Sequence, residues 1–379
     1  MKWPSRDVEG NTHPVSGFPA DADTALANAS AILQRKDGPN DVGCNVTLQR
    51  TGLISVFDIQ VPADIYKDTD FQEVCATAGY VHVVSSINYC GGLYSSNIIG
   101  CSTTPGKCMV VVRYATDASD IEGILWAHEY GHTKGLQHRS DESAIMNPYV
   151  GASERGVNTS ECHAFQGTMT YQATGKQPTA RPSVVDFVHR TYFEGTPYAI
   201  ASTYGADDAK TLLQLLGKTE ERPFYSNIVT TLGMIGDPVA VEPLKSFITK
   251  GEGTIDGNTA RAKTTAVTAL GYIVNKSHDK NALQFLARGM EPTDWESRLE
   301  WLPAGQTIND RTFSLVRAAI YGLAFAGTPE AEIALASSKT QLSSALEPKL
   351  SERAAKDVDE ALKINNTIQH ETLQKYLSQ

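Results

Sequence analysis

The chain has 379 residues, 41% hydrophobic and 20% charged, and its formal net charge is −10. This length exceeds a single ordinary core and predicts two or three domains of a soluble globular protein. No apolar run reaches the roughly 18 residues that a membrane helix needs. A chain this acidic also lacks the basic face of a protein that binds the phosphate backbone of nucleic acid. Membrane-spanning and nucleic-acid-binding proteins are therefore excluded.

The cysteines all lie in the first 162 residues, at Cys44, Cys75, Cys90, Cys101, Cys108 and Cys162. An even number confined to one region favours three disulfides and an oxidising compartment. Reduced thiols or a metal site are the alternatives, and the absence of any CxxC pair argues against a zinc cluster. Six cysteines allow 15 pairings, of which the sequence selects none. We expect a secreted, extracellular or periplasmic protein whose signal peptide has been removed, because no apolar stretch follows the first residues.

Residues 1–175 are predicted to form one α/β domain, because strand and helix patterns alternate along them. Early acidic and late basic residues predict a helix at 20–36. β-branched and aromatic residues predict strands at 45–57 and 79–88, and a continuous apolar run predicts a buried strand at 109–114. A second helix is expected at 119–134.

The composition changes near residues 174–182 (TGKQPTARP), which predicts a linker at 176–189. Helical patterns dominate afterwards, and Gly233, Gly271 and Gly322 each lie in a similar short motif before an amphipathic helix. Residues 190–340 therefore resemble the HEAT-like repeat family, in which stacked helix pairs bury a shared core. A plain helical bundle is the alternative. The charged tail at 341–379 is expected to form a capping helix.

One motif carries the chemistry, HEYGHTKGLQH at residues 128–138. On a helix, His128 and His132 project from one face and can hold one metal ion. Glu129 lies beside this pair, where a carboxylate can act as a base. Gly135 can adopt a positive φ and turn the chain, which brings His138 back as a third ligand. Three histidines with an open position are typical of catalytic zinc.

This motif, followed by AIMNPY at residues 144–149, resembles the signature of the metzincin zinc peptidases and is nearest to the matrixin branch. The resemblance implies an α+β catalytic domain with a twisted mixed sheet and an active-site helix. It also implies that His128, His132 and His138 bind one catalytic Zn²⁺, that Glu129 is the general base, and that Met146 is the Met-turn residue beneath the zinc. Arg139 departs from the serine usual in matrixins, and no histidine- and aspartate-rich segment for structural zinc and calcium is present.

Two further features are interpreted through this resemblance. Tyr149 lies three residues after Met146, so we expect it to form a pocket wall or contact substrate rather than bind zinc. Residues 95–106 precede the last strand before the active-site helix, where a metzincin has the edge strand that binds substrate in extended form. A disulfide-tied surface loop is the alternative for this segment.

The sequence thus predicts a secreted zinc endopeptidase acting on protein or peptide substrates, with a partner or substrate exosite on the helical repeats. One alternative is a helical-repeat binding module with a non-catalytic metal site. Another is a zinc hydrolase of narrow specificity that acts on glycoproteins. Asp64, Asp68 and Asp70 offer carboxylates to calcium, but a solvated acidic loop is the favoured interpretation.

Overall fold

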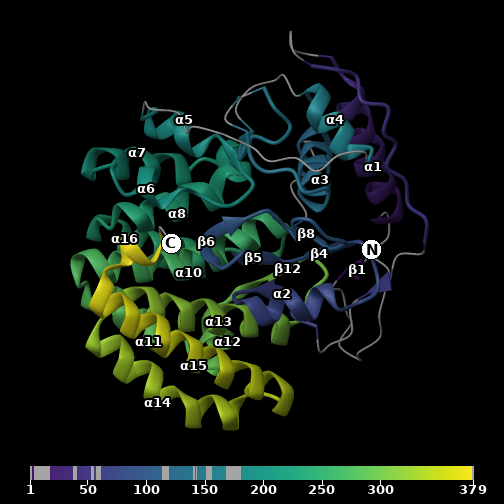
Figure 1. Ribbon diagram of the computed structural model, residues 1–379. Coiled ribbons are helices and arrows are strands. Elements are labelled where there is room, and N and C mark those ends of the chain that lie inside the picture. Colours follow the sequence, from purple (N-terminus) through teal and green to yellow (C-terminus); the bar gives the residue numbers. More distant parts are fainter. Residues whose placement is uncertain are drawn as a thin grey trace. The chain divides into compact units, whose positions relative to one another are not determined.

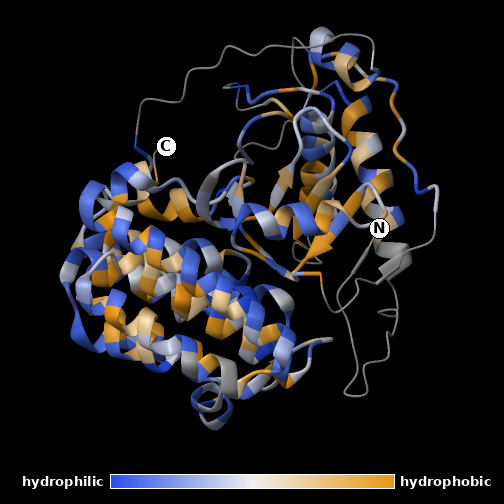
Figure 2. Ribbon diagram, turned by 60° about the horizontal axis from the view of Figure 1, so that its bottom comes forward, coloured by the Kyte–Doolittle hydropathy of each residue, from blue (hydrophilic) through white to orange (hydrophobic). Residues whose placement is uncertain are grey.

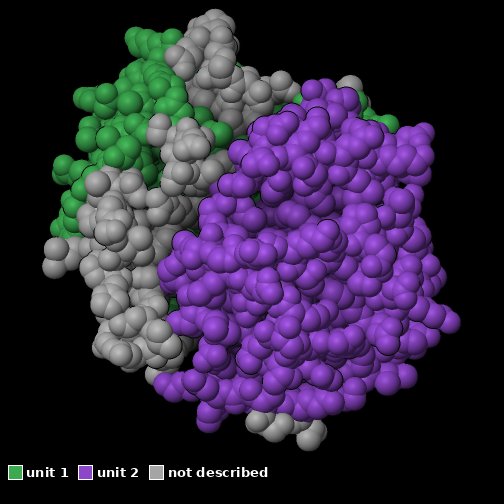
Figure 3. Space-filling view, turned by 180° about the vertical axis from the view of Figure 1, so that it is seen from behind, with its two compact units in different colours: residues 1–182, 190–195 green, residues 183–189, 196–379 purple. Residues whose placement is uncertain are grey.

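A computed structural model describes residues 2–3, 18–36, 41–52, 55–56, 61–112, 119–139, 141, 143–150, 156–167 and 181–377. The chain divides into two compact units, which Figure 3 colours separately. Unit 1 comprises Met1–Pro182 and Arg190–Gly195, and unit 2 comprises Ser183–His189 and Thr196–Gln379. Arg190–Gly195, where the helical repeats were predicted to begin, therefore groups with unit 1.

Unit 1 contains a five-stranded mixed sheet (Figure 1) of order β2-β1-β4-β8-β7. Strand β7 lies at one edge and runs antiparallel to β8, whereas the other neighbours in this sheet are parallel. A smaller sheet has the order β3-β5-β6, and β9 pairs with β10. The bounds are β1 (Lys2–Trp3), β2 (Ser55–Val56), β3 (Asp64–Ile65), β4 (Val81–Val84), β5 (Ser86–Cys90), β6 (Leu93–Ile98), β7 (Gly100–Ser102), β8 (Met109–Val112), β9 (Tyr149–Val150) and β10 (Thr191–Tyr192).

The described helices of unit 1 are α1 (Phe18–Gln34), α2 (Asp68–Cys75), α3 (Ser119–Thr133) and α4 (Thr159–Phe165). Helices α1 and α3 agree with the helices expected at residues 20–36 and 119–134. They pack closely on each other, and a Cβ at Gly123 would lie only 2.7 Å from Asn28 Cβ. Strand β8 is buried along its whole length, as its apolar run predicts.

The strand predicted at residues 45–57 is wrong over most of its length, because among the described residues of this range, 45–52 and 55–56, only Ser55–Val56 is a strand. Residues 45–52 instead run beside α1 without strand pairing. The Leu48 amide donates to Ser30 Oγ at 2.8 Å, and the Cys44 amide just before this segment donates to the Leu33 carbonyl at 2.9 Å. Hydrogen bonds to α1 thus take the place of hydrogen bonds to a neighbouring strand in this segment. The single strand expected at 79–88 is two strands, β4 and β5, which belong to different sheets.

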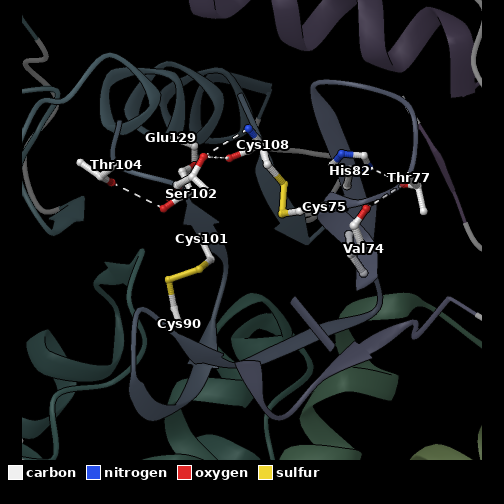
Figure 4. The surroundings of a disulfide bond; sticks show 11 residues. Val74, Cys75, Thr77, His82, Cys90, Cys101, Ser102, Thr104, Cys108 and Glu129 are labelled. Atoms are coloured by element: carbon white, nitrogen blue, oxygen red, sulfur yellow. Dashed lines mark hydrogen bonds between the residues drawn. A yellow bond between two sulfur atoms is a disulfide. The ribbon is translucent and has the colours of Figure 1, made fainter. Parts of the chain in front are cut away.

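Three disulfides form, which confirms the expectation from the cysteine count. They join Cys44 to Cys162, Cys75 to Cys108 and Cys90 to Cys101. The last bond ties the middle residue of β7 to the last residue of β5 (Figure 4). Residues 95–106 therefore include both an edge strand and a disulfide tether.

Unit 2 is mostly helical, and hydrophobic residues concentrate on the faces that its helices turn toward one another (Figure 2). Strands β11 (Glu252–Ile255) and β12 (Glu300–Pro303) form a parallel pair. The helices are α5 (Val184–Val188), α6 (Tyr198–Ala201), α7 (Ala206–Leu216), η1 (Thr219–Phe224), α8 (Tyr225–Ile235), η2 (Pro238–Ala240), α9 (Val241–Thr249), α10 (Gly257–Ser277), α11 (Lys280–Arg288), α12 (Pro292–Arg298), α13 (Ile308–Ala326), α14 (Pro329–Ala345), α15 (Pro348–Glu371) and α16 (Leu373–Tyr376).

The inner helices of unit 2 stack in chain order, with α10 between α8 and α13, and with α15 against α13 and α14. Two of the matched glycines allow close approach. A Cβ at Gly233 would meet Ala269, and one at Gly271 would overlap the Gly322 backbone. A buried ion pair joins Arg317 Nε to Asp357 Oδ2 at 2.7 Å. Across the described residues, none of the helices combines the length and apolarity needed to cross a bilayer.

Candidate metal centre

Helix α3 carries the first two histidines of the motif. His128 and His132 lie one turn apart and both are buried, at 0% and 8% exposure. The helix ends at Thr133, and Gly135 has a φ of +86°, a left-handed conformation that favours glycine. The Leu136 amide donates back to the Gly131 carbonyl at 3.1 Å. This turn returns the chain so that His138 faces the first two histidines, as the spacing predicts.

The three Nε2 atoms converge on one point. They are separated by 3.1 Å (His132–His128), 3.2 Å (His132–His138) and 3.3 Å (His138–His128). Tetrahedral zinc with Zn–N bonds of 2.0–2.1 Å places its ligand atoms about 3.3 Å apart. The three separations therefore fit a single zinc ion.

Hydrogen bonds fix the tautomers of the two helical histidines. His128 Nδ1 lies 2.8 Å from the Ile145 carbonyl, and His132 Nδ1 lies 2.8 Å from the Leu136 carbonyl. Because a carbonyl can only accept, each Nδ1 carries the proton and each Nε2 presents its lone pair to the centre. Adjacent lone pairs at this distance repel unless a cation lies between them. The donor set therefore fits a metal ion.

Burial also keeps these imidazoles neutral. It lowers the pKa of His132 and of His138 to about 4, and the pKa of His128 falls well below its ordinary value for the same reason. Unprotonated nitrogens are what metal binding requires. The site is therefore ready to bind a cation at neutral pH without first losing protons.

Glu129 follows His128 on α3 and is 1% exposed. Ser102 Oγ donates to its Oε2 at 2.6 Å (Figure 4), and a Cβ at Gly100 would overlap the Glu129 carboxylate. Burial raises the pKa of Glu129 to about 8, and the Ser102 hydrogen bond opposes this rise. Edge strand β7 thus supplies both the space and the hydrogen bond that position the carboxylate.

Met146 is fully buried, at 0% exposure, beneath the helix that carries the histidines. A Cβ at Gly131 would overlap the Met146 sulfur, so the glycine within the motif lets the methionine approach α3. The neighbouring Ile145 carbonyl is the partner of His128 Nδ1. Arg139, where matrixins have serine, forms an ion pair of 3.0 Å with buried Glu161.

Tyr149 lies in β9, and its ring contacts two residues of unit 1. The Arg190 guanidinium lies 4.7 Å from the ring centroid, and the Tyr192 ring lies 6.2 Å away. This environment is compatible with the expectation that Tyr149 forms a wall.

Three residues near the centre were not singled out in the sequence. Ser102 could have been found, because it lies within the expected edge segment. Phe193, whose ring stacks on His128 with centroids 4.2 Å apart, and Glu194, whose Oε1 lies 3.5 Å from His138 Nε2, gave no local signal. Both follow His138 by more than 50 residues and lie beyond the predicted domain boundary.

In the described part of the chain, the three histidines form the one group of three or more metal-ligating side chains that converges. The interpretation of Asp64, Asp68 and Asp70 as a solvated acidic loop is wrong for two of them. Asp64 accepts a hydrogen bond from Ser86 Oγ at 2.7 Å, and Asp70 accepts one from the Tyr66 amide at 3.0 Å. These two carboxylates are 5% and 0% exposed.

The geometry is that of a zinc-type metal centre of three histidines with a carboxylate beside it. The family model described as matrixin, of peptidase family M10, matches residues 102–166. This segment holds Ser102, Glu129, the three histidines and Met146. Its likeness to the matrixins suggests a zinc metallopeptidase. Neither the curated proteins nor the solved structures gave a match.

Proposed function

We propose that the protein is a secreted, zinc-dependent endopeptidase of the metzincin type. The observation that carries the proposal is the convergence of three neutral histidine Nε2 atoms, 3.1–3.3 Å apart, beside the buried Glu129. A structural zinc site usually has four protein ligands, whereas these histidines leave a position for a reactant. The matrixin match over residues 102–166 supports the same conclusion.

In this proposal His128, His132 and His138 hold the zinc. Zinc in such a site supplies a Lewis acid that lowers the pKa of water to about 7 and polarises a peptide carbonyl. The positive charge of zinc would favour the ionised form of Glu129 against the rise in pKa that burial causes. In that form Glu129 accepts the proton of the attacking water at its carboxylate and then delivers it to the leaving amine. Ser102 holds the carboxylate in place for both transfers, and Met146, as the Met-turn residue, supports the histidines from below.

Two other features belong to this proposal. Three disulfides suit an oxidising compartment, which supports secretion. The close approach of α8 to α10 and of α10 to α13 at glycines supports the interpretation of unit 2 as HEAT-like repeats.

The test measures zinc content and cleavage of unfolded casein by the full chain. We expect one zinc per chain and cleavage that a chelator removes. Glu129→Gln should retain the zinc and lose cleavage by at least about 100-fold, since general acid–base catalysis contributes that much or more. Glu122→Gln removes the same charge from the first turn of the same helix and serves as the matched control.

Cleavage by Glu129→Gln at the wild-type rate would contradict the proposed role. Zinc binding with no cleavage of casein or of a mixed peptide library would favour the non-catalytic binding module. A protein without zinc affinity would overturn the assignment of the three histidines.

A further inference from the structure

The segment Arg190–Gly195 of unit 1 lies beside the metal centre and is hydrogen-bonded on both of its sides. Strand β10 pairs antiparallel with β9, with Thr191 opposite Val150 and Tyr192 opposite Tyr149. The next amide, that of Phe193, donates to the Pro148 carbonyl at 3.1 Å. The segment is therefore bonded to the chain that follows Met146.

The same residue is also bonded on its other side. The Phe193 carbonyl accepts from the Ile99 amide at 2.9 Å and from the Gly100 amide at 3.3 Å. Gly100 is the first residue of β7, the strand at the edge of the five-stranded sheet. The peptide groups of Phe193 thus connect the edge strand β7 to Pro148, two residues after Met146.

The side chains of this segment lie against the metal ligands. The Phe193 ring is stacked on His128 at an interplanar angle of 29° and is 1% exposed. The next residue, Glu194, has Oε1 3.5 Å from His138 Nε2, beside the converging group of three histidines but not part of it. The Glu194 side chain is half-exposed, so the carboxylate lies toward the solvent side of the centre.

An edge strand is where an extended peptide adds to a sheet through main-chain hydrogen bonds. A substrate bound beside β7 needs the Gly100 amide, which Phe193 already uses, and the metal's open position, beside which Glu194 lies. A substrate peptide and the Arg190–Gly195 segment therefore compete for the same groups.

We propose that Arg190–Gly195 is an internal ligand of this centre, with Phe193 in the place of a substrate residue and with the half-exposed Glu194 carboxylate turning from its place beside His138 to bind the metal. This inference rests on the proposed function. The segment must leave the edge strand before a peptide substrate binds, so the resting chain is held in a closed, low-activity state. Peptide cleavage then depends on what displaces the segment.

The test uses two full-chain variants. Phe193→Ala removes the ring from His128, and Glu194→Ala removes the carboxylate at a half-exposed position where a loss of folding is not expected. Glu291→Ala, an exposed carboxylate in unit 2, is the matched control. The probe is acetohydroxamate, a small metal-binding molecule, and its affinity for the zinc-loaded protein is measured by calorimetry.

When its own chain closes a centre, the apparent Kd for a probe rises in inverse proportion to the fraction of molecules whose centre is open. We expect each variant to bind acetohydroxamate at least about tenfold more tightly than the wild type, while the control is unchanged. In the cobalt(II)-substituted protein, Glu194→Ala should alter the visible absorption spectrum, because it removes one ligand. The kcat/KM for a peptide should rise in both variants.

Unchanged acetohydroxamate affinity in both variants would overturn the proposal. A tenfold gain in Phe193→Ala alone, with an unchanged cobalt spectrum in Glu194→Ala, would overturn the role of Glu194 and keep that of Phe193. Neither readout needs peptide cleavage. If all variants bind zinc and the probe but cleave no peptide, the peptidase function fails while the internal ligand is still judged by the affinities.

Discussion

Ser102 donates a 2.6 Å hydrogen bond to Glu129, which links the edge strand β7 to the carboxylate beside the three histidines. A hydrogen bond to a charged group contributes about 1.5–3 kcal/mol, and a free carboxylate would adopt other rotamers. The hydroxyl therefore restricts Glu129 to one position.

Ser102→Ala should lower kcat for peptide cleavage about tenfold, since 1.4 kcal/mol corresponds to a factor of ten. KM and zinc content should stay unchanged, because the substitution removes only a hydroxyl that bonds to Glu129 and keeps the main chain of β7, beside which substrate would bind. Steady-state kinetics with parallel zinc analysis measure the effect. Ser102→Thr keeps the hydroxyl and should restore most of kcat, and a threonine variant as slow as the alanine variant would contradict the positioning role.

Gly100→Ala should also displace the Glu129 carboxylate, in this case by a steric clash. The added Cβ would overlap the Glu129 side chain and force it out of position. A displacement of about 1 Å at a catalytic group can cost about 100-fold in rate. Cleavage should fall by that order with zinc retained. Gly52→Ala, at a position with no neighbouring atom within 4 Å, is the control, and equal losses in the two variants would refute this explanation.

The disulfide Cys44–Cys162 should contribute most to the stability of unit 1 among the three, because it spans 118 residues. The chain-entropy estimate is about 5 kcal/mol for this bond and about 3 kcal/mol for Cys90–Cys101, which spans 11 residues. Replacing each pair by alanines and measuring urea unfolding tests the order. A larger loss for the Cys90–Cys101 pair would contradict it.

Lys263 in α10 should make the stability of unit 2 depend on pH. Its Nζ donates to the Phe247 and Lys250 carbonyls, and burial lowers its pKa from 10.5 to about 8. Between these values the unfolded chain binds a proton that the folded chain does not, so the free energy of unfolding rises with pH across this window. The rise is at most about 3 kcal/mol.

Urea unfolding at pH 8 and pH 10 measures this effect as the difference between wild type and Lys263→Met. The variant should lack the rise. Lys250→Met, which changes an exposed lysine at the end of α9, should keep it. Parallel pH dependence in the wild type and Lys263→Met would contradict the role of Lys263.

The metal centre was predictable because its information is local. A four-residue spacing places His128 and His132 on one helix face, and Gly135 supplies the turn that returns His138. The prediction of a strand at residues 45–57 failed because β-branched residues indicate a strand propensity but do not identify the hydrogen-bond partner. Ser30 of α1 is the partner of Leu48 in this segment. Phe193 and Glu194 reach the centre through pairing with β9 and through the bonds of Phe193 to Ile99 and Gly100, which no local pattern encodes.

The order in which the chain contributes to its two units limits how they can be separated. The chain leaves unit 1 after Pro182, returns to it for Arg190–Gly195, and enters unit 2 again at Thr196. A fragment that stops before residue 190 therefore lacks Phe193 and Glu194, whereas one that includes them carries α5 of the helical unit with it. Unit 1 can therefore not be expressed separately by ending the chain at a single position. Any truncation or fusion must keep residues 183–195 together, because this stretch contributes to both units.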